Sequence, residues 1–448
     1  MDTPIYDFVR GYAAQNSLRL HMPGHKGVCV SGAEPFDITE IPGADSLFEA
    51  DGIIRRSELN AGELFGAHSF YSTEGSSLCI RAMLYLALVC AGNKGKRNVV
   101  LAGRNAHKTF LSAAALLDFD VQWIYGSGGH SYLSCCIDAD QLDAVLTDAE
   151  TKPVAVYVTS PDYLGNMTDI SAVSAVCRRH GVLLLADNAH GAYLKFLPQS
   201  RHPMDSGADM CCDSAHKTLP VLTGGAYLHI SKSAPDMCVG NAKTALALFG
   251  STSPSYLILQ SLDLANKYLA DGYSEKLEAF VQKVQLLKSN LETMGYTFVG
   301  DEPLKLTIAT KSCGYTGEEF AAQLNKRNII CEFADRDFVV LMLTPHIGDE
   351  GLSNIEAAMS SISPKVPLEE LPPAIPRLQQ VMTVRAAVME HSELLPADKC
   401  SGRVLAAASV GCPPAVPVVA CGEMIDDKAV ECFRYYGIKS CRVVKQLR

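Results

Sequence analysis

Short, continuous apolar runs alternate with amphipathic helical patterns from about residue 41 to residue 265, and this alternation constrains the fold more than any other feature. The clearest runs cover residues 98–102, 153–158 and 181–186. Apolar runs without polar alternation are typical of strands that are buried on both faces, and the helical segments between them supply the crossovers that parallel strands need. The sequence therefore predicts an α/β domain with a mostly parallel central sheet covered by helices on both sides.

The rest of the chain is organised around this domain. The predicted parts are an N-terminal arm (1–40), the large α/β domain (41–265), a small α+β domain (266–362), a Pro-rich linker (363–377) and a C-terminal domain (378–448). One long helical pattern over 255–294 marks the passage from the large to the small domain. Within the small domain the pattern predicts a helix over 317–327 and a strand over 338–343.

Charge and composition narrow the class of protein. The 448 residues carry a net charge of −10, whereas nucleic acids and anionic membranes are bound by concentrated Lys and Arg. The sequence contains neither a signal-type N-terminus nor an apolar run of the roughly 18 residues that a membrane span needs. The 16 cysteines include no pair with two residues between them, so zinc-type spacing is absent. We expect a cytoplasmic protein with reduced thiols and no metal site.

Polar side chains directly follow several apolar runs. Asp187 and His190 follow the run 181–186, and Ser214, His216 and Lys217 follow the run that ends at residue 212. Polar residues also follow 98–102, at 105–108, and 153–158, at 160–162. In an open parallel sheet, ligands bind beyond the carboxyl ends of the strands. We therefore expect these side chains to share one binding site.

Lys217 and Asp187 suggest which ligand this site holds. A Lys amine forms an imine with an aldehyde cofactor, and an Asp carboxylate keeps a pyridine nitrogen protonated, so that the ring can accept electrons. This pair of roles predicts pyridoxal 5′-phosphate (PLP). His107 is the candidate for a ring stacked on the cofactor face. The bond that breaks depends on which substrate substituent stands perpendicular to the cofactor ring, and the spacing of residues does not decide that.

A phosphate-binding segment is expected near residue 75. The residues Ser-Thr-Glu-Gly-Ser-Ser at 72–77 precede a helical pattern over 78–89. Backbone N–H groups and hydroxyls at a helix N-terminus point toward an anion and bind it favourably. Gly75, Ser76 and Ser77 are therefore candidate cofactor-binding residues.

These motifs together resemble the Orn/Lys/Arg decarboxylase family, and the resemblance extends over nearly the whole chain. The segments that carry it are 21–27 (HMPGHKG), 37–45, 63–67, 186–192 (ADNAHGA), 214–220 (SAHKTLP) and 251–256. The resemblance implies the fold of aspartate aminotransferase, the PLP-dependent fold type I. It also implies the compact form of the family that is used in polyamine synthesis and lacks an N-terminal wing domain.

The resemblance assigns roles to residues at matching positions. Lys217 holds the imine, Asp187 contacts the pyridine nitrogen, and His107 stacks on the ring. The residues expected at the cofactor are Gly75, Ser76, Ser77, His107, Asp187, His190, Ser214, His216 and Lys217, with Ser251 and Thr252 expected to reach the phosphate of a neighbouring subunit. A homodimer with shared active sites, or a higher homo-oligomer, is thus implied.

The sequence also departs from the family pattern. Asn188 stands where many compact members have Glu, and Glu74 stands where many have Asn. The usual Tyr-Pro-Pro-Gly stretch is replaced by Cys-Pro-Pro-Ala at 412–415. Glu423 resembles the acidic residue that in relatives binds the distal cationic group of the substrate, which is chemically sensible for ammonium or guanidinium.

The expected function is decarboxylation of arginine, lysine or ornithine to CO2 and the corresponding amine. Lys217 and His216, both expected in catalysis, are candidates for protonating the substrate α-carbon. One alternative is another fold type I enzyme, such as an aminotransferase or a carbon–sulfur lyase, since one fold supports many reactions. An aminotransferase usually needs an Arg for the α-carboxylate, and Arg336 is available. A third alternative, a cofactor-binding protein without turnover, is disfavoured because both Lys217 and Asp187 are present.

Overall fold

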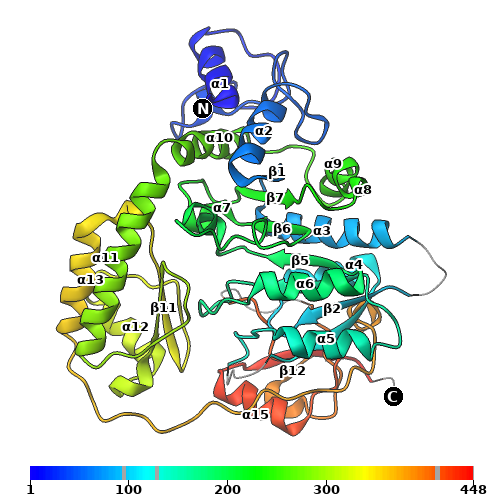
Figure 1. Cartoon of the computed structure of the whole chain (residues 1–448), viewed down its shortest axis with the longest axis vertical. Helices are drawn as coiled ribbons and strands as arrows, with labels where there is room; N and C mark the ends of the chain where they lie inside the picture. The colour runs from blue at the N-terminus through cyan, green and yellow to red at the C-terminus, as the bar shows by residue number, and fades with distance from the viewer. Residues whose placement is uncertain (93–96, 127–130, 409–413, 447–448) are drawn as a thin grey trace. The chain divides into compact units, whose positions relative to one another are not determined.

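The computed structural model describes residues 1–92, 97–126, 131–408 and 414–446 (Figure 1). The chain divides into two compact units, and each is made of segments that are far apart in the sequence. The first unit comprises Met1–Lys96, Val154–Val156 and Ile170–Leu277. The second comprises Arg97–Pro153, Tyr157–Asp169 and Glu278–Arg448. The first unit contains most of the residues expected at the cofactor.

Four strands of the first unit lie in the order β1, β7, β6, β5. Their bounds are β1 His68–Ser72, β5 Leu183–Asp187, β6 Met210–Asp213 and β7 Ala226–Ile230. β5 and β6 are parallel, with Asp187 opposite Cys212. β7 is antiparallel to both β6 and β1. Every residue of β6 and β7 is buried, as expected for strands that helices cover on both faces.

The helices of the first unit follow the apolar pattern of the sequence. They are α1 Pro4–Ala14, α2 Ile53–Phe65, α3 Gly75–Ala91, α6 Ile170–His180, α7 Ala215–Thr218, α8 Asp236–Gly240, α9 Ala242–Ala247 and α10 Tyr256–Ala270. Short 3-10 turns occur at Glu34–Phe36, Leu47–Glu49 and Ala192–Phe196. α3 packs against β5, β6 and β7 and buries most of its apolar side chains there. The expected helix after the phosphate-binding segment is therefore present, and it begins at Gly75.

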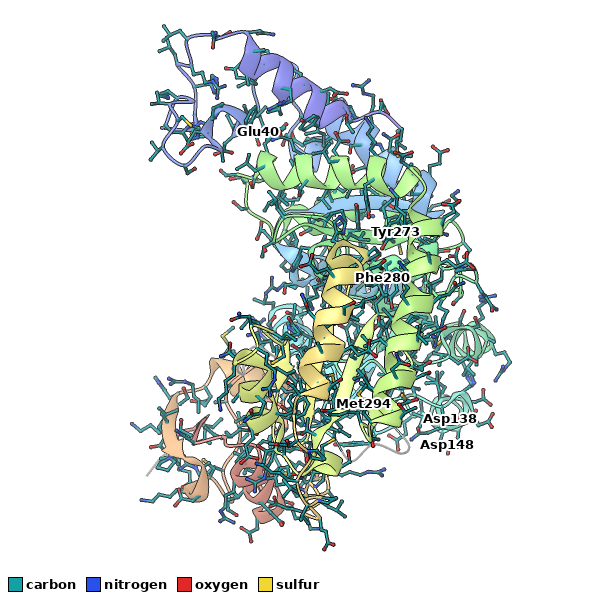
Figure 2. The ribbon with its side chains drawn as sticks, turned by 90° about the vertical axis from the view of Figure 1, so that its left-hand side faces the viewer. Glu40, Asp138, Asp148, Tyr273, Phe280 and Met294 are labelled. Atoms are coloured by element: carbon teal, nitrogen blue, oxygen red, sulfur yellow. The ribbon has the colours of Figure 1, made fainter. Side chains whose placement is uncertain are left out.

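The predicted helical pattern over 255–294 is present but is interrupted. It forms α10 Tyr256–Ala270 and α11 Tyr273–Thr293. Gly272 between them has φ +67°, a left-handed conformation that ends a helix and that glycine adopts at little cost. Figure 2 labels Tyr273, Phe280 and Met294, which mark the start and middle of α11 and the residue after its end.

The second unit contains the parallel strands β2 Val99–Gly103 and β3 Asp120–Ile124 and a smaller antiparallel sheet. That sheet has the order β10 Phe333–Ala334, β11 Phe338–Met342, β9 Lys305–Ala309, β8 Phe298–Val299. β4 Ala155–Thr159 lies at the boundary between the two units. The helices of this unit are α4 Lys108–Leu117, α5 Ala139–Thr147, α12 Gly317–Asn325, α13 Gly348–Ser360, α14 Val384–Met389 and α15 Asp427–Tyr435.

The predicted elements of the small domain are found with nearly the expected bounds. α12 begins at a capping box between Thr316 and Glu319, and β11 occupies the predicted strand. α13 lies beside α11 in both views (Figures 1 and 2), and Lys283 Nζ lies 2.5 Å from Asp349 Oδ1 between them. Residues 363–379 contain no helix or strand.

The C-terminal part is built on a two-stranded antiparallel sheet, β12 Ser392–Pro396 and β13 Ser440–Val444. α15 packs its buried side chains into a small core with residues of these strands. Within the described ranges, every cysteine is a free thiol, and no helix has the length and apolar composition needed to cross a membrane.

Candidate active site

Asp187 and Lys217 occupy the ends of two neighbouring parallel strands. Asp187 is the last residue of β5 and is 2% exposed, and Lys217 lies in α7, just after β6. Because parallel strands end at the same edge of a sheet, both residues belong to one edge. The apolar runs that precede Asp187 and Lys217 in the sequence therefore predict that both residues lie at this edge.

The carboxylate of Asp187 accepts hydrogen bonds from its own loop and from β6. Its Oδ1 accepts hydrogen bonds from the Ala189 N–H, at 3.2 Å, and from the Cys212 thiol, at 3.6 Å. Burial, with the nearby Asp187 charge, raises the pKa of the Cys212 thiol well above its usual value, so the thiol keeps its proton and donates it. These contacts fix the orientation of the acid expected to face a pyridine nitrogen.

Lys217 contacts a residue of the loop that follows β5. Its Nζ lies 3.0 Å from His190 Nε2, and His190 is 7% exposed. His216, beside Lys217 in the sequence, is directed elsewhere, because its Nδ1 lies 3.0 Å from the backbone oxygen of Gly225. Burial lowers the pKa of His216, and the charge of Lys217 lowers it further, so His216 is neutral near neutral pH.

The expected phosphate-binding residues converge at the N-terminus of α3. Ser214 donates a hydrogen bond of 2.8 Å from its side chain to that of Ser76. Gly75 has φ +69° and donates its N–H to the Gly224 oxygen at 2.7 Å, which fixes the start of the helix. Ser77 occupies the next position of the first turn. Hydroxyls from two segments and the positive end of a 17-residue helix thus lie together.

Asn188, one of the departures from the family pattern, ties the two strand ends together. Its side-chain nitrogen donates to Asp213 Oδ1 at 2.7 Å, and its backbone N–H donates to the Cys212 oxygen at 3.0 Å. A Cβ atom at Gly191 would lie only 2.1 Å from the Asn188 side chain, so the loop needs glycine there. The residues after Asp187 are therefore anchored to the segment that carries Lys217.

Asp213 is the centre of a buried polar network. His202, Cys211 and Asp213 place potential metal-binding atoms within 4.8 Å of one another. However, the Met204 N–H donates to His202 Nδ1, so Nε2 carries the proton that points at Asp213 Oδ2, 2.9 Å away. A protonated imidazole nitrogen has no lone pair for a metal ion. Burial alone would raise the pKa of Asp213, but its contacts with His202 and His229 lower it below its usual range. We interpret the cluster as a hydrogen-bonded network around an ionised Asp213.

Ser251 and Thr252, expected to serve a neighbouring subunit, lie in an exposed segment. The backbone N–H of Ser251 donates to Glu74 Oε1 at 2.6 Å, and Glu74 directly precedes Gly75. Glu74, the other departure in the phosphate-binding segment, thus holds the Ser251 segment of its own chain.

His107 belongs to the second unit. It is the N-terminal cap of α4, where its Nδ1 accepts from the Thr109 N–H at 3.2 Å and lies 2.9 Å from the Thr109 hydroxyl. Lys108, the first residue of that helix, donates its backbone N–H to the Ala415 oxygen at 2.8 Å. The role of His107 as a ring stacked on the cofactor remains a prediction. Within the altered Pro-rich segment, residues 412 and 413 lie outside the described ranges.

Glu423, also in the second unit, is 1% exposed and is paired with an arginine. Its Oε2 accepts from the Ala420 N–H at 2.6 Å and lies 3.3 Å from Arg104 Nη2. Burial raises the pKa of Glu423, and Arg104 opposes that shift. Its Oε1 has no hydrogen-bond partner among the described residues.

Arg104 was not among the residues expected in the site. It also donates to the backbone oxygens of Pro417 and Val418, at 2.9 and 2.8 Å, and its guanidinium lies over the Trp123 ring. The sequence could have indicated Arg104, because it directly follows β2 and directly precedes the polar stretch 105–108. The pairing with Glu423 gave no such signal, because it joins residues 319 positions apart.

The side chains of the first unit suit PLP. Lys217 offers an amine to the aldehyde, Asp187 offers a buried carboxylate to the pyridine nitrogen, and Ser76 and Ser214 offer hydroxyls to the phosphate beside a helix N-terminus.

Comparisons with known proteins agree with this chemistry. A family model described as Orn/Lys/Arg decarboxylase, major domain, matches residues 3–300, and one described as its C-terminal domain matches residues 372–443. The uncharacterized protein YaaO of Bacillus subtilis is 29% identical over 96% of this chain and 93% of its own. An arginine decarboxylase of the same organism is 27% identical over 96% of this chain and 92% of its own.

Among solved structures, lysine decarboxylase A from Pseudomonas aeruginosa has a TM-score of 0.80 at 16% identity, covering 99% of this chain and 80% of its own. This likeness confirms the predicted α/β fold of type I PLP enzymes. Family membership also favours a decarboxylase over an aminotransferase, a carbon–sulfur lyase or a protein without turnover. The chain belongs to the Orn/Lys/Arg decarboxylase family and is a PLP-dependent decarboxylase.

Proposed function

We propose that the substrate is arginine, lysine or ornithine, and that the amine product enters polyamine-type metabolism. The observation that supports a working active site most strongly is the 3.0 Å contact between Lys217 and His190, a residue that follows the buried Asp187 by three positions. Arginine is the first substrate to test, because a relative aligned over almost its whole length is an arginine decarboxylase.

The residues of the first unit have distinct tasks in this proposal. PLP, when bound, accepts the electron pair that the departing CO2 leaves behind. Lys217 supplies the amine that holds the cofactor, and Asp187 keeps a proton on the pyridine nitrogen. Ser76 and Ser214, with Gly75 and Ser77, bind the phosphate at the N-terminus of α3. His107 stacking on the ring stays part of the proposal.

Glu423 is proposed to recognise the distal cationic group of the substrate. Arg104 and the Ala420 N–H occupy its Oε2, whereas Oε1 has no hydrogen-bond partner among the described residues. A buried carboxylate oxygen without a donor is a favourable partner for an ammonium or guanidinium group. Selection among basic amino acids that differ by a methylene is worth only about 1–3 kcal/mol, so pocket depth has to supply it.

We further propose a homodimer, in which Ser251 and Thr252 reach the partner's phosphate site. The N-terminal segment 18–30 exposes apolar side chains that a second copy would cover. They are Leu18, Leu20, Met22, Val28 and Val30, with exposed fractions of 66–88%.

The free thiols suit a reducing compartment, which supports the expected cytoplasmic location. The five-part domain division stays a proposal as well.

Product analysis tests the proposed function directly. The PLP-loaded protein is incubated separately with arginine, lysine, ornithine and several neutral amino acids, and the products are identified by mass spectrometry. We expect loss of CO2 from one basic amino acid and no reaction in the Lys217→Ala variant. Keto-acid products, or equal turnover by Lys217→Ala, would contradict the proposal.

A further inference from the structure

The Lys217 amine contacts the side chain of His190. The two nitrogens, Lys217 Nζ and His190 Nε2, are 3.0 Å apart, a hydrogen-bond distance. They come from different segments, since His190 follows β5 and Lys217 follows β6. His190 is 93% buried, so this contact belongs to the interior of the site rather than to its rim.

The position of His190 is fixed by the loop that carries it. Gly191 donates its N–H to the Asn188 oxygen at 2.8 Å, and Asn188 is anchored to Asp213. The side chains of Asn188 and Asp213 are both 0% exposed. A base held this rigidly meets the geometric requirement for repeated proton exchange with one atom.

His216, the histidine that the sequence favoured for proton transfer, is less suitable. Its Nδ1 lies 3.0 Å from the Gly225 oxygen, and as a donor to that oxygen it cannot also face Lys217 with the same nitrogen. Asp187, another titratable group at this sheet edge, accepts hydrogen bonds at its Oδ1 from the Ala189 N–H and from the Cys212 thiol. His190 is therefore the imidazole placed to exchange a proton with Lys217.

Imine formation is helped by a group that takes a proton from the lysine. An ordinary Lys amine is protonated at neutral pH, whereas only the neutral amine has the lone pair that attacks an aldehyde. An imidazole ordinarily titrates near pH 6.5 and can hold the proton during that step.

We propose that His190 is the proton-exchange partner of Lys217, and this rests on the proposed PLP-dependent function. The Lys217 ammonium gives one proton to His190 Nε2, which leaves a neutral amine and an imidazolium, and the reverse transfer restores both. When CO2 leaves, the bond between the α-carbon and the carboxylate breaks and its electron pair stays behind. The same proton is then available to the substrate α-carbon. His190 thereby replaces His216 as the second member of the proton-donating pair.

The test uses cofactor-free protein, so that it does not depend on decarboxylation. The rate of acetylation of Lys217 by acetic anhydride is measured by peptide mass spectrometry from about pH 5 to about pH 9, a range that brackets the usual titration of imidazole. The wild-type rate is expected to rise in two steps, the first from imidazole and the second from the amine. In His190→Gln the first step should disappear, and the rate near neutral pH should fall at least about tenfold.

His180→Gln, at the end of α6, is the matched control and should keep both steps. Thermal unfolding and circular dichroism establish that each variant is folded, and His190→Asn replaces His190→Gln if the latter is not. A two-step profile that persists in a folded His190 variant would overturn the proposal. If the wild type fails to decarboxylate any basic amino acid but the first step depends on His190, the proposed function fails and the proton exchange stands.

Discussion

Ser76 and Ser214 are joined by a 2.8 Å hydrogen bond between their side chains, although 138 positions separate them in the sequence. One serine lies in the first turn of α3 and the other directly precedes α7. The bond places two hydroxyls beside the positive end of a long helix, which is the arrangement that an anionic group prefers. It also links the phosphate-binding helix to the segment that carries Lys217.

Ser76→Ala and Ser214→Ala should each raise the dissociation constant of PLP about tenfold, since a hydrogen bond to a charged group contributes about 1.5–3 kcal/mol. Titration of cofactor-free protein measures this. The double variant should lose less than the product of the two effects, because the two hydroxyls interact. Ser233→Ala, which removes another 2.8 Å serine–serine contact, is the control and should bind PLP normally. Unchanged affinity in both active-site variants would place the phosphate elsewhere.

Asp187→Asn should lower kcat by about a hundredfold or more, because an amide cannot keep the pyridine nitrogen protonated. Covalent attachment of PLP through Lys217 should persist, and borohydride trapping followed by intact-mass measurement checks it. Cys212→Ser keeps a donor toward Asp187 and should retain most of the activity. A wild-type kcat in Asp187→Asn would show that another group holds the ring proton.

Glu423→Gln should raise KM for the basic substrate by at least about tenfold and change kcat less, because a charge-assisted contact to the distal group is lost. Removing one member of a buried ion pair costs about 3–5 kcal/mol, so the variant should also unfold at a lower temperature than the wild type. Glu393→Gln removes a partly exposed Glu–Arg pair of the same C-terminal part and should leave KM unchanged. An unaltered KM in Glu423→Gln would remove Glu423 from the substrate site.

Asp263 should make stability depend on pH. Its carboxylate is fully buried and accepts from the backbone N–H groups of Ile5 and Tyr6, and burial raises its pKa from the usual 3.8 to about 6. Between these values the folded state holds more protons than the unfolded state, so the free energy of unfolding falls as the pH rises through this window. The total effect is about 3 kcal/mol.

Chemical denaturation at several pH values measures this dependence. Asp263→Asn should flatten it, whereas Asp271→Asn, at the exposed end of α10, should leave it unchanged. Equal pH dependence in wild type and Asp263→Asn would assign the effect to other groups.

Charge in the exposed N-terminal segment should prevent dimer formation. Leu20→Glu and Val30→Glu together place two carboxylates on a surface that is proposed to be covered by a second copy, where unpaired charge is costly. Light scattering should then report about half the wild-type mass, and PLP affinity should fall with it. Leu371→Glu, at a residue that is 81% exposed, is the control. A dimer of normal mass in the double variant would locate the interface elsewhere.

Local pattern determined much of this protein. The buried run before Asp187, the polar residues after β6 and the helical period of α3 and α12 all depend on neighbours a few positions apart, and each element was found close to its predicted bounds. The resemblance to the Orn/Lys/Arg decarboxylase family rests on the same short segments. The break at Gly272 was missed, because a single glycine does not interrupt an apolar period strongly enough to be predicted from the sequence.

Tertiary structure decided the pairings that tune the site. His190 rather than His216 meets Lys217, Asn188 joins Asp213, and Arg104 occupies one oxygen of Glu423. Each pairing depends on which strand ends lie next to each other and on how a side chain is directed after the backbone is placed. A sequence period fixes the face of an element but not its neighbour, so the residue types of the site could be predicted and their partners could not.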